Sequence, residues 1–264
     1  MSGYHVRNDV LVVLRVLRGW SQGELAAAAG VAPDNISKYE RGTTATPPEL
    51  LERLVTAMGY PGQMVERTAA FARMALKMRD AGAGGQPGES IEAAVAALAA
   101  EMGWSWEGTV REKVTRVLEE AEILDARRRA RALWARLRPY PHEARLALVR
   151  EGEELSGWAL AELLCERSVE AAADDAGAAV EVAELAVAVA ERARGRRPTP
   201  REAQGYAWGF LGNARRVRGE FEAAERAFAR SAELWPQLPA CDGCPLDGNR
   251  LLALEASLRR EQRR

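Results

Sequence analysis

The sequence offers few residues that could perform catalysis or hold a metal ion. Its two histidines, His5 and His142, lie far apart in the chain and are not at metal-ligand spacing. The many glutamates recur at helix-surface spacing, and neither a phosphate-binding loop nor a nucleophile elbow is present. We therefore expect no enzyme activity, no cofactor and no bound metal.

The three cysteines also argue against a disulfide framework. Cys165 lies in an apolar helical pattern, which predicts a small core residue. Cys241 and Cys244 form a single CxxC in the turn "PACDGCPLD", with no second Cys or His pair nearby. One isolated pair is weak support for zinc or redox chemistry, and a reduced, cytoplasmic protein fits better.

Charge and hydropathy narrow the possible partners. The net charge is −1, so no global field draws the chain to nucleic acid or lipid, although residues 1–80 carry +2. No apolar run is long enough to span a membrane, since Val10–Leu17 is short and is interrupted by Arg15. Any contact with nucleic acid must therefore come from a local N-terminal surface, and we expect no membrane partner.

That surface needs elements to position it, and the stretch "WSQGELAAAAGVAPDNISKYERG" at residues 20–42 supplies them. Ser21 and Glu24 form an S-x-x-E capping box that starts a helix, and Gly30 suits the left-handed position that ends it. Pro33 then fits the first turn of a second short helix, which runs to about Arg41. Two short helices joined by a tight turn with glycine predict a helix-turn-helix.

Apolar spacing supports the same interpretation. Contacts between these helices are expected at Leu25, Ala26, Val31 and Ile36. An upstream helix carries Leu11, Leu14 and Leu17, and a downstream helix carries Leu50, Leu51, Leu54 and Met58. A second capping box, Thr46-Pro47-Pro48-Glu49, is predicted to start the downstream helix.

The string "LRVLRGWSQGELAAAAGVAPDNISKYERG" resembles the XRE-family helix-turn-helix of phage repressors and their bacterial relatives, over about residues 7–60. The resemblance implies a five-helix, repressor-like domain whose second motif helix, Pro33–Arg41, enters the major groove of double-stranded DNA as part of a homodimer. It also implies a structural ion pair between Arg15 and Glu40.

The resemblance assigns roles to particular side chains of this helix and its surroundings. The candidate base-contacting residues are Asp34, Ser37 and Lys38, of which Asp34 can accept from cytosine and Lys38 can donate to guanine. The candidate DNA backbone contacts are Gln22, Asn35, Arg41 and Thr43.

The rest of the chain also reads as helical, since alternating β-branched runs are absent, and this predicts an all-α fold. The Gly-rich stretch "DAGAGGQPGES" at residues 80–90 predicts a linker between a DNA-binding domain at 1–79 and a helical domain at 91–264. Helices are expected at about 107–138, 143–152, 156–173, 177–194, 201–218, 221–235 and 246–262. We interpret the basic cluster Arg127–Arg131 as a solvated face rather than a second nucleic-acid site.

Residues 206–236, "YAWGFLGNARRVRGEFEAAERAFARSAELWP", are similar to a tetratricopeptide repeat in the spacing of their glycines, alanines and aromatic residues. The resemblance implies an α-solenoid that binds a peptide or protein effector on its concave face. The candidate effector contacts are Tyr206, Asn213 and Arg216, and a purely solvated role for them is about equally compatible with the sequence.

Together these features predict a DNA-binding transcriptional regulator that associates with the nucleoid when bound to DNA. Its C-terminal repeats are expected to sense a peptide or protein effector or to mediate dimerisation. Two alternatives remain open. The chain could be an antitoxin that represses its own operon and neutralises a partner toxin, or an interaction scaffold whose helix-turn-helix does not bind DNA.

Overall fold

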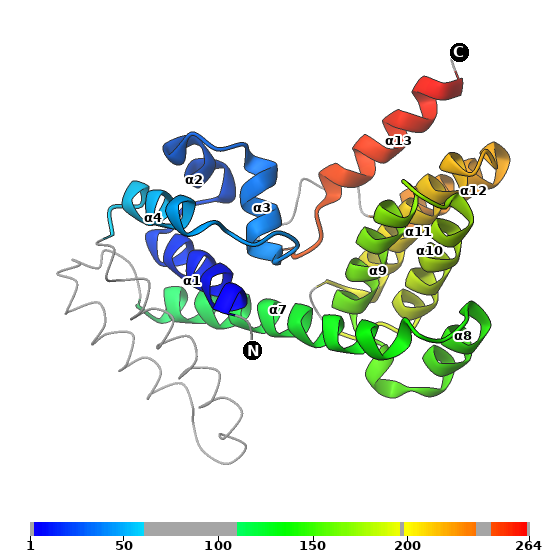
Figure 1. Cartoon of the computed structure of the whole chain (residues 1–264), viewed down its shortest axis with the longest axis horizontal. Coiled ribbons are helices and arrows are strands. Elements are labelled where there is room, and N and C mark those ends of the chain that lie inside the picture. Colours follow the sequence, from blue (N-terminus) through cyan, green and yellow to red (C-terminus); the bar gives the residue numbers. More distant parts are fainter. Residues whose placement is uncertain (1–2, 61–109, 196–197, 236–243, 263–264) are drawn as a thin grey trace. The chain divides into compact units, whose positions relative to one another are not determined.

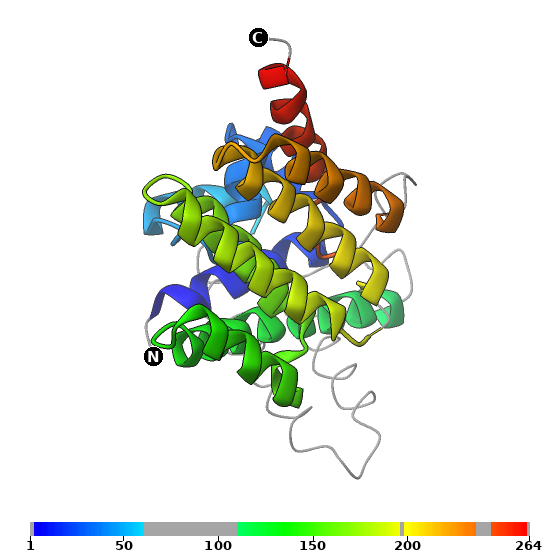
Figure 2. The same cartoon turned by 90° about the vertical axis from the view of Figure 1, so that its right-hand side faces the viewer.

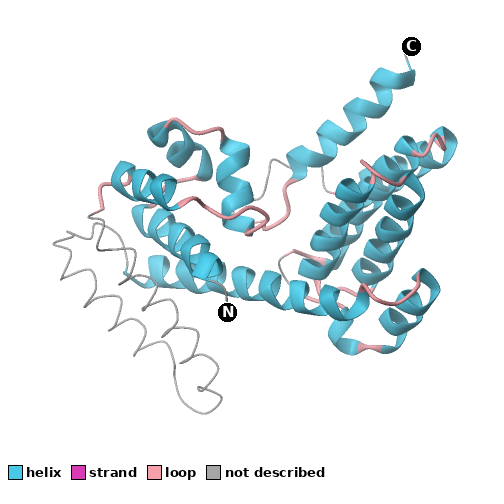
Figure 3. Ribbon diagram, in the orientation of Figure 1, coloured by secondary structure: helices cyan, strands magenta, loops and turns pink. Residues whose placement is uncertain are grey.

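The computed structural model describes residues 3–60, 110–195, 198–235 and 244–262, and helices joined by turns account for these residues without any strand (Figure 3). The predicted all-α class is confirmed. The chain divides into two compact units, Met1–Asp125 and Ala126–Arg264, with the boundary inside one long helix. The predicted linker at 80–90, and the part of the predicted first domain beyond residue 60, lie outside the described residues.

The first unit contains the four N-terminal helices, α1 (Gly3–Arg18), α2 (Gln22–Ala29), α3 (Pro33–Arg41) and α4 (Pro48–Ala57), coloured blue to cyan in Figure 1. Their shared core contains the predicted contact residues Leu25, Ala26 and Ile36, with Val31 packed at its edge. The other core residues come from α1 and from α4 and its C-terminal turn: Val10, Leu11, Leu14, Leu51, Leu54, Val55, Met58 and Tyr60.

Local signals start and end α2 as the sequence predicts. The Glu24 amide donates to the Ser21 hydroxyl over 3.2 Å, and the Ser21 amide donates to the Glu24 carboxylate over 2.7 Å, which completes the capping box. Gly30 ends the helix with φ 64°, a left-handed conformation that costs other residues energy. Pro33 then occupies the first turn of α3.

The start of α4 differs from the prediction. The N-cap is Pro47, without a side-chain hydrogen bond, and Thr46 is 1% exposed one residue earlier. A residue that precedes proline is forced out of the helical region, so Pro47, which precedes Pro48, adopts ψ 143° and cannot be the first helical residue. The predicted Thr46–Glu49 capping box is therefore wrong.

The second unit begins within α7 (Val110–Leu137) and continues through α8 (His142–Glu151) and the short 3₁₀-helix η1 (Glu153–Leu155). It then contains α9 (Trp158–Ala171), α10 (Ala176–Glu191), α11 (Pro200–Val217), α12 (Phe221–Leu234) and α13 (Gly248–Gln262). Figure 2 shows α10, α11 and α12 side by side, and α9 packs along α10. These bounds agree with the predicted helices to within about three residues.

Small residues set the close spacing of α11 and α12. A Cβ atom added at Gly205 would lie 2.8 Å from the Trp235 amide nitrogen, and one at Gly212 would lie 2.8 Å from the Phe228 ring. The Ser231 hydroxyl donates to the Gly205 carbonyl oxygen over 2.7 Å across the same interface. This pairing of large side chains with glycine is consistent with the predicted tetratricopeptide-like array.

Candidate nucleic-acid interface

The α3 helix has one buried and one exposed side. Ile36 and Glu40 are 0% and 3% exposed and face the core of the first unit. Asp34, Asn35 and Lys38 are exposed, and Ser37 is half-buried. The three candidate base-contacting residues therefore lie together on the solvent side of α3 or at its edge, as a helix that enters the major groove requires.

A buried polar network fixes α3 against its neighbours. The Arg15 guanidinium of α1 donates to both carboxylate oxygens of Glu40, over 2.6 and 2.9 Å, and also to the Trp20 carbonyl oxygen over 2.9 Å. Burial lowers the pKa of Arg15, but the hydrogen bond and the charge of Glu40 outweigh it, so that pKa is raised. The predicted structural pair of Arg15 and Glu40 is present.

The sequence did not indicate that Gln22 belongs to the same network. Its Nε2 atom donates to the second Glu40 carboxylate oxygen over 2.7 Å, which connects the first turn of α2 to the last turn of α3. One end of the Gln22 amide is therefore held inside the motif. Its predicted contact with a DNA phosphate stays a prediction.

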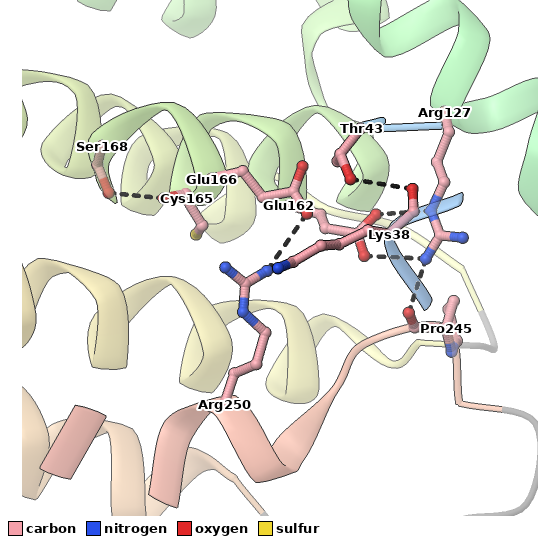
Figure 4. Close-up of polar contacts among 9 residues, drawn as sticks. All are labelled: Lys38, Thr43, Arg127, Glu162, Cys165, Glu166, Ser168, Pro245 and Arg250. Carbon is pink, nitrogen blue, oxygen red and sulfur yellow. Dashed lines mark hydrogen bonds and ion pairs between the residues drawn. The ribbon is translucent and has the colours of Figure 1, made fainter. Parts of the chain in front are cut away.

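The two basic residues of α3 that are candidates for DNA contact, Lys38 and Arg41, differ in their exposure to solvent. The Thr43 hydroxyl donates to the Lys38 carbonyl oxygen over 3.0 Å, which caps the helix terminus (Figure 4). The Lys38 side chain is exposed, whereas Arg41 is only 9% exposed. Lys38 is thus placed to reach DNA directly, and Arg41 contributes mostly to the interior of the unit.

The four N-terminal helices have no net charge to attract DNA. Residues 3–60 contain six Arg and Lys side chains and six Asp and Glu side chains. Arg15 and Glu40 neutralise each other inside the unit. Long-range attraction is therefore weak, and binding at this surface depends on short-range contacts from α3.

The structure places the three candidate effector contacts inside the second unit. Tyr206 is 1% exposed, with its ring centroid 4.8 Å from that of Phe210, and Asn213 is 5% exposed. The Asn213 Oδ1 atom accepts from the Arg216 Nη2 atom over 3.0 Å, and Arg216 also pairs with Glu261 of α13. Tyr206 and Asn213, which were predicted to line an open groove, are therefore buried, and Arg216 is paired with α13.

A second polar network in this unit joins segments that are distant in the sequence (Figure 4). Arg127 donates to both oxygens of Glu162 over 2.8 and 2.9 Å and to the Pro245 carbonyl oxygen over 2.8 Å. Arg250 pairs with Glu166 over 3.3 Å. The Arg127 side chain is 13% exposed, so the interpretation of a solvated face is wrong for this residue. No local motif marks a pair 35 residues apart.

Cys165 is buried next to this network, as the sequence predicts for a core residue. Burial raises the pKa of its thiol well above the ordinary value, which keeps the thiol protonated and unreactive. Cys244 is half-buried, and Cys241 lies outside the described residues. Within the described ranges, no group of three or more His, Cys, Asp and Glu side chains could hold a metal ion.

In the comparison with known protein families, one region of the chain has a match. Residues 13–64 match a family model described as helix-turn-helix, and the matched region holds part of α1 and all of α2, α3 and α4. Comparisons with curated proteins and with solved structures found no match. The match supports a DNA-binding regulator in general and does not extend to the second unit. Of the helices that the structure describes, none is long and apolar enough to cross a membrane.

Proposed function

We propose that this chain is a sequence-specific transcriptional regulator whose α3 helix reads base edges in the major groove of double-stranded DNA. The observation that carries the proposal is the exposure of Asp34, Asn35 and Lys38 on one side of α3, within a region that matches a helix-turn-helix model. The opposite side of the helix is held by buried Ile36 and Glu40, so the exposed side is presented on a fixed support.

The chemistry of the exposed side chains suggests their roles. The Lys38 ammonium group donates hydrogen bonds, which suits the O6 and N7 acceptors of guanine. The Asp34 carboxylate accepts, which suits the N4 amino group of cytosine. Asn35 and the half-buried Ser37 can donate to phosphate or base oxygens at the edge of the contact.

A homodimer fits this weakly charged surface better than a monomer. With equal numbers of basic and acidic side chains in residues 3–60, one copy gains little from phosphate neutralisation. Two copies on paired half-sites multiply the short-range contacts, so each copy can remain weak alone. The second unit is our candidate for dimerisation or for effector binding, because it holds a separate core of stacked helices.

The experiment that tests the proposal is selection of bound duplexes from a random library by the purified full-length chain. We expect a recurring sequence motif and a measurable decrease of affinity with salt. Recovery of duplexes without any shared motif would contradict sequence-specific binding and favour the scaffold alternative. A toxin co-purifying with the chain, together with a motif upstream of its own gene, would favour the antitoxin alternative.

A further inference from the structure

The α13 helix lies on the part of α11 that the repeat pattern assigns to ligands. Its buried residues Leu251 and Leu258 are 8% and 4% exposed, whereas its neighbour Leu252 is 67% exposed. One side of α13 is therefore packed and the other is open to solvent. The packed side contacts α11, and Leu258 reaches a small cluster with Ala224 and Phe228 of α12.

The apolar contact with α11 depends on a missing side chain. A Cβ atom added at Gly209 would lie 2.5 Å from the Leu251 Cδ2 atom and 3.1 Å from the Ser231 Oγ atom. Leu251 thus fills a notch that exists only because residue 209 is glycine. At the start of α13, a Cβ at Gly248 would lie 3.0 Å from the Trp235 indole, so α13 begins directly against that ring.

Charged pairs hold α13 at both ends. Near its start, Arg250 pairs with Glu166 of α9 over 3.3 Å (Figure 4). The Arg250 guanidinium also lies 5.3 Å from the centroid of the Phe210 ring. Near its end, Glu261 pairs with Arg216 of α11. The Arg250 and Glu261 side chains are 29% and 41% exposed, so water competes for both pairs.

Leu251 joins the main core of the second unit, but α13 is held less extensively than α12, which buries five residues along its length. α12 is fixed by the backbone of Trp235 lying against Gly205 and by the Phe228 ring lying against Gly212, whereas α13 contributes two buried leucines and two charged pairs that are partly solvated. The contacts of α13 also include Arg216 and, through it, Asn213, which are two of the three candidate effector contacts. Release of α13 would therefore expose that surface without separating α11 from α12.

We propose that α13 is an intramolecular ligand of α11, and that the effector is an amphipathic helical peptide segment that binds there by displacing it. The proposal rests on the effector role proposed above for the second unit. The displacing segment would carry the features that α13 presents, namely an arginine followed by leucine, a second leucine seven residues later and a carboxylate three residues after that. These groups address Glu166, the notch at Gly209, Phe228 and Arg216, respectively.

The test uses the full-length chain and a fluorescent synthetic peptide of residues 246–262 as the probe. Leu251→Asp in the chain should weaken its own α13 and raise peptide affinity at least tenfold over wild type. Adding Gly209→Ala to Leu251→Asp should abolish this binding, because the new Cβ fills the notch that the peptide leucine needs. A peptide with Leu251→Asp is the matched negative control.

A charge exchange tests the other end of the site. Arg216→Glu in the Leu251→Asp chain should lose affinity for the natural peptide and recover it with a peptide carrying Glu261→Arg. Equal affinity of the wild-type and Leu251→Asp chains for the peptide, or binding that ignores Gly209→Ala, would overturn the proposal.

Hydrogen exchange on the wild-type chain provides a measurement that needs no variant. We expect the amides of α13 to exchange at least a hundredfold faster than those of α11 and α12. Equal protection of the three helices would show that α13 is part of the core and overturn the proposal. Because neither assay contains DNA, failure here leaves the proposed DNA binding intact, and a failed DNA selection leaves this result intact.

Discussion

Lys38 and Arg41 lie one helical turn apart on α3, and their surroundings differ. Lys38 extends into solvent, whereas Arg41 is 9% exposed and contributes to the interior of the first unit. The family resemblance of this stretch of sequence made both candidates for DNA contact. Their burial divides them, because a side chain held inside the domain cannot follow the phosphate backbone without disturbing its own packing.

Replacement of Lys38 by alanine should weaken binding to the selected duplex by about 1–3 kcal/mol, the range for a paired base contact. Stability should change by no more than about 0.5 kcal/mol, as for exposed positions. Fluorescence anisotropy with selected and scrambled duplexes measures the first quantity, and thermal unfolding measures the second. Arg41→Ala is the comparison variant, for which we expect the larger loss of stability. Unchanged affinity in Lys38→Ala would exclude docking through this side of α3.

Tyr60 connects the C-terminal turn of α4 to α1. Its hydroxyl donates to the Leu14 carbonyl oxygen over 3.2 Å, and burial raises its pKa above the ordinary value against the opposing charge of Arg18. The folded first unit therefore binds this proton more tightly than the unfolded chain. The stabilisation is complete below the unfolded pKa of about 10 and decreases as the pH rises above it.

Tyr60→Phe should cost about 1 kcal/mol at pH 8, because the Leu14 carbonyl oxygen loses its donor. Above pH 10 the free energy of unfolding of the wild type should decrease by about 1.4 kcal/mol per pH unit because of Tyr60. The variant lacks this hydroxyl and should not show that decrease. The stability difference should therefore close within roughly one pH unit above pH 10. Chemical unfolding between pH 8 and 11 measures it, with exposed Tyr140→Phe as control. A difference that stays constant with pH would contradict the assigned role of Tyr60.

At the scale of helices, the sequence predicts where a helix begins and ends when this depends on residues only a few positions apart. Ser21 with Glu24 starts α2, and Gly30 ends it, because caps involve groups only a few residues apart. Thr46 shows where this reasoning fails. Threonine is a good capping residue, but Pro48 forces the backbone of Pro47 out of the helical region. The helix therefore begins at Pro48, and its N-cap is Pro47 rather than Thr46.

Contacts between distant segments could not be predicted in this way. The bond from Gln22 to Glu40 and the pair of Arg127 with Glu162 join residues separated by 18 and 35 positions. Their existence depends on how whole helices pack, which no local motif encodes. The burial of Asn213 likewise depends on the packing of whole helices, since the repeat pattern alone places this residue on an open ligand face.

Gly212→Ala tests the close packing of α11 against α12. The added Cβ would lie 2.8 Å from the Phe228 ring, so the ring or the helix must move, at a cost of about 1–3 kcal/mol. Gly157→Ala is a suitable control, because a Cβ at that position meets nothing within 4 Å. Urea unfolding followed by circular dichroism measures both variants. Equal stability of the two would mean that α11 and α12 are not closely packed at this point.

At the scale of the whole molecule, each described core lies within a single unit. The core of the first unit uses residues between Val10 and Tyr60, and the main core of the second uses residues between Ala130 and Leu251. Separate cores allow separate folding. The division at residues 125 and 126 falls later than the predicted linker at 80–90, which lies outside the described residues, so the predicted boundary stays a prediction.

A chain ending at residue 125 should therefore fold cooperatively and bind one half-site as strongly as the full-length chain. If the second unit dimerises the protein, the full-length chain should bind paired half-sites at least a hundredfold more tightly than the fragment, because the second contact becomes intramolecular. The advantage should be greatest when the half-site centres are about 10–10.5 base pairs apart and should decrease when half a helical turn is inserted, since the second site then faces away.

Anisotropy titrations over a series of spacings measure this advantage in affinity, with light scattering to give the mass of each free protein. Identical affinity of fragment and full-length chain at every spacing would rule out dimerisation through the second unit. A fragment that prefers the same spacing as the full-length chain would place the dimer contact within residues 1–125.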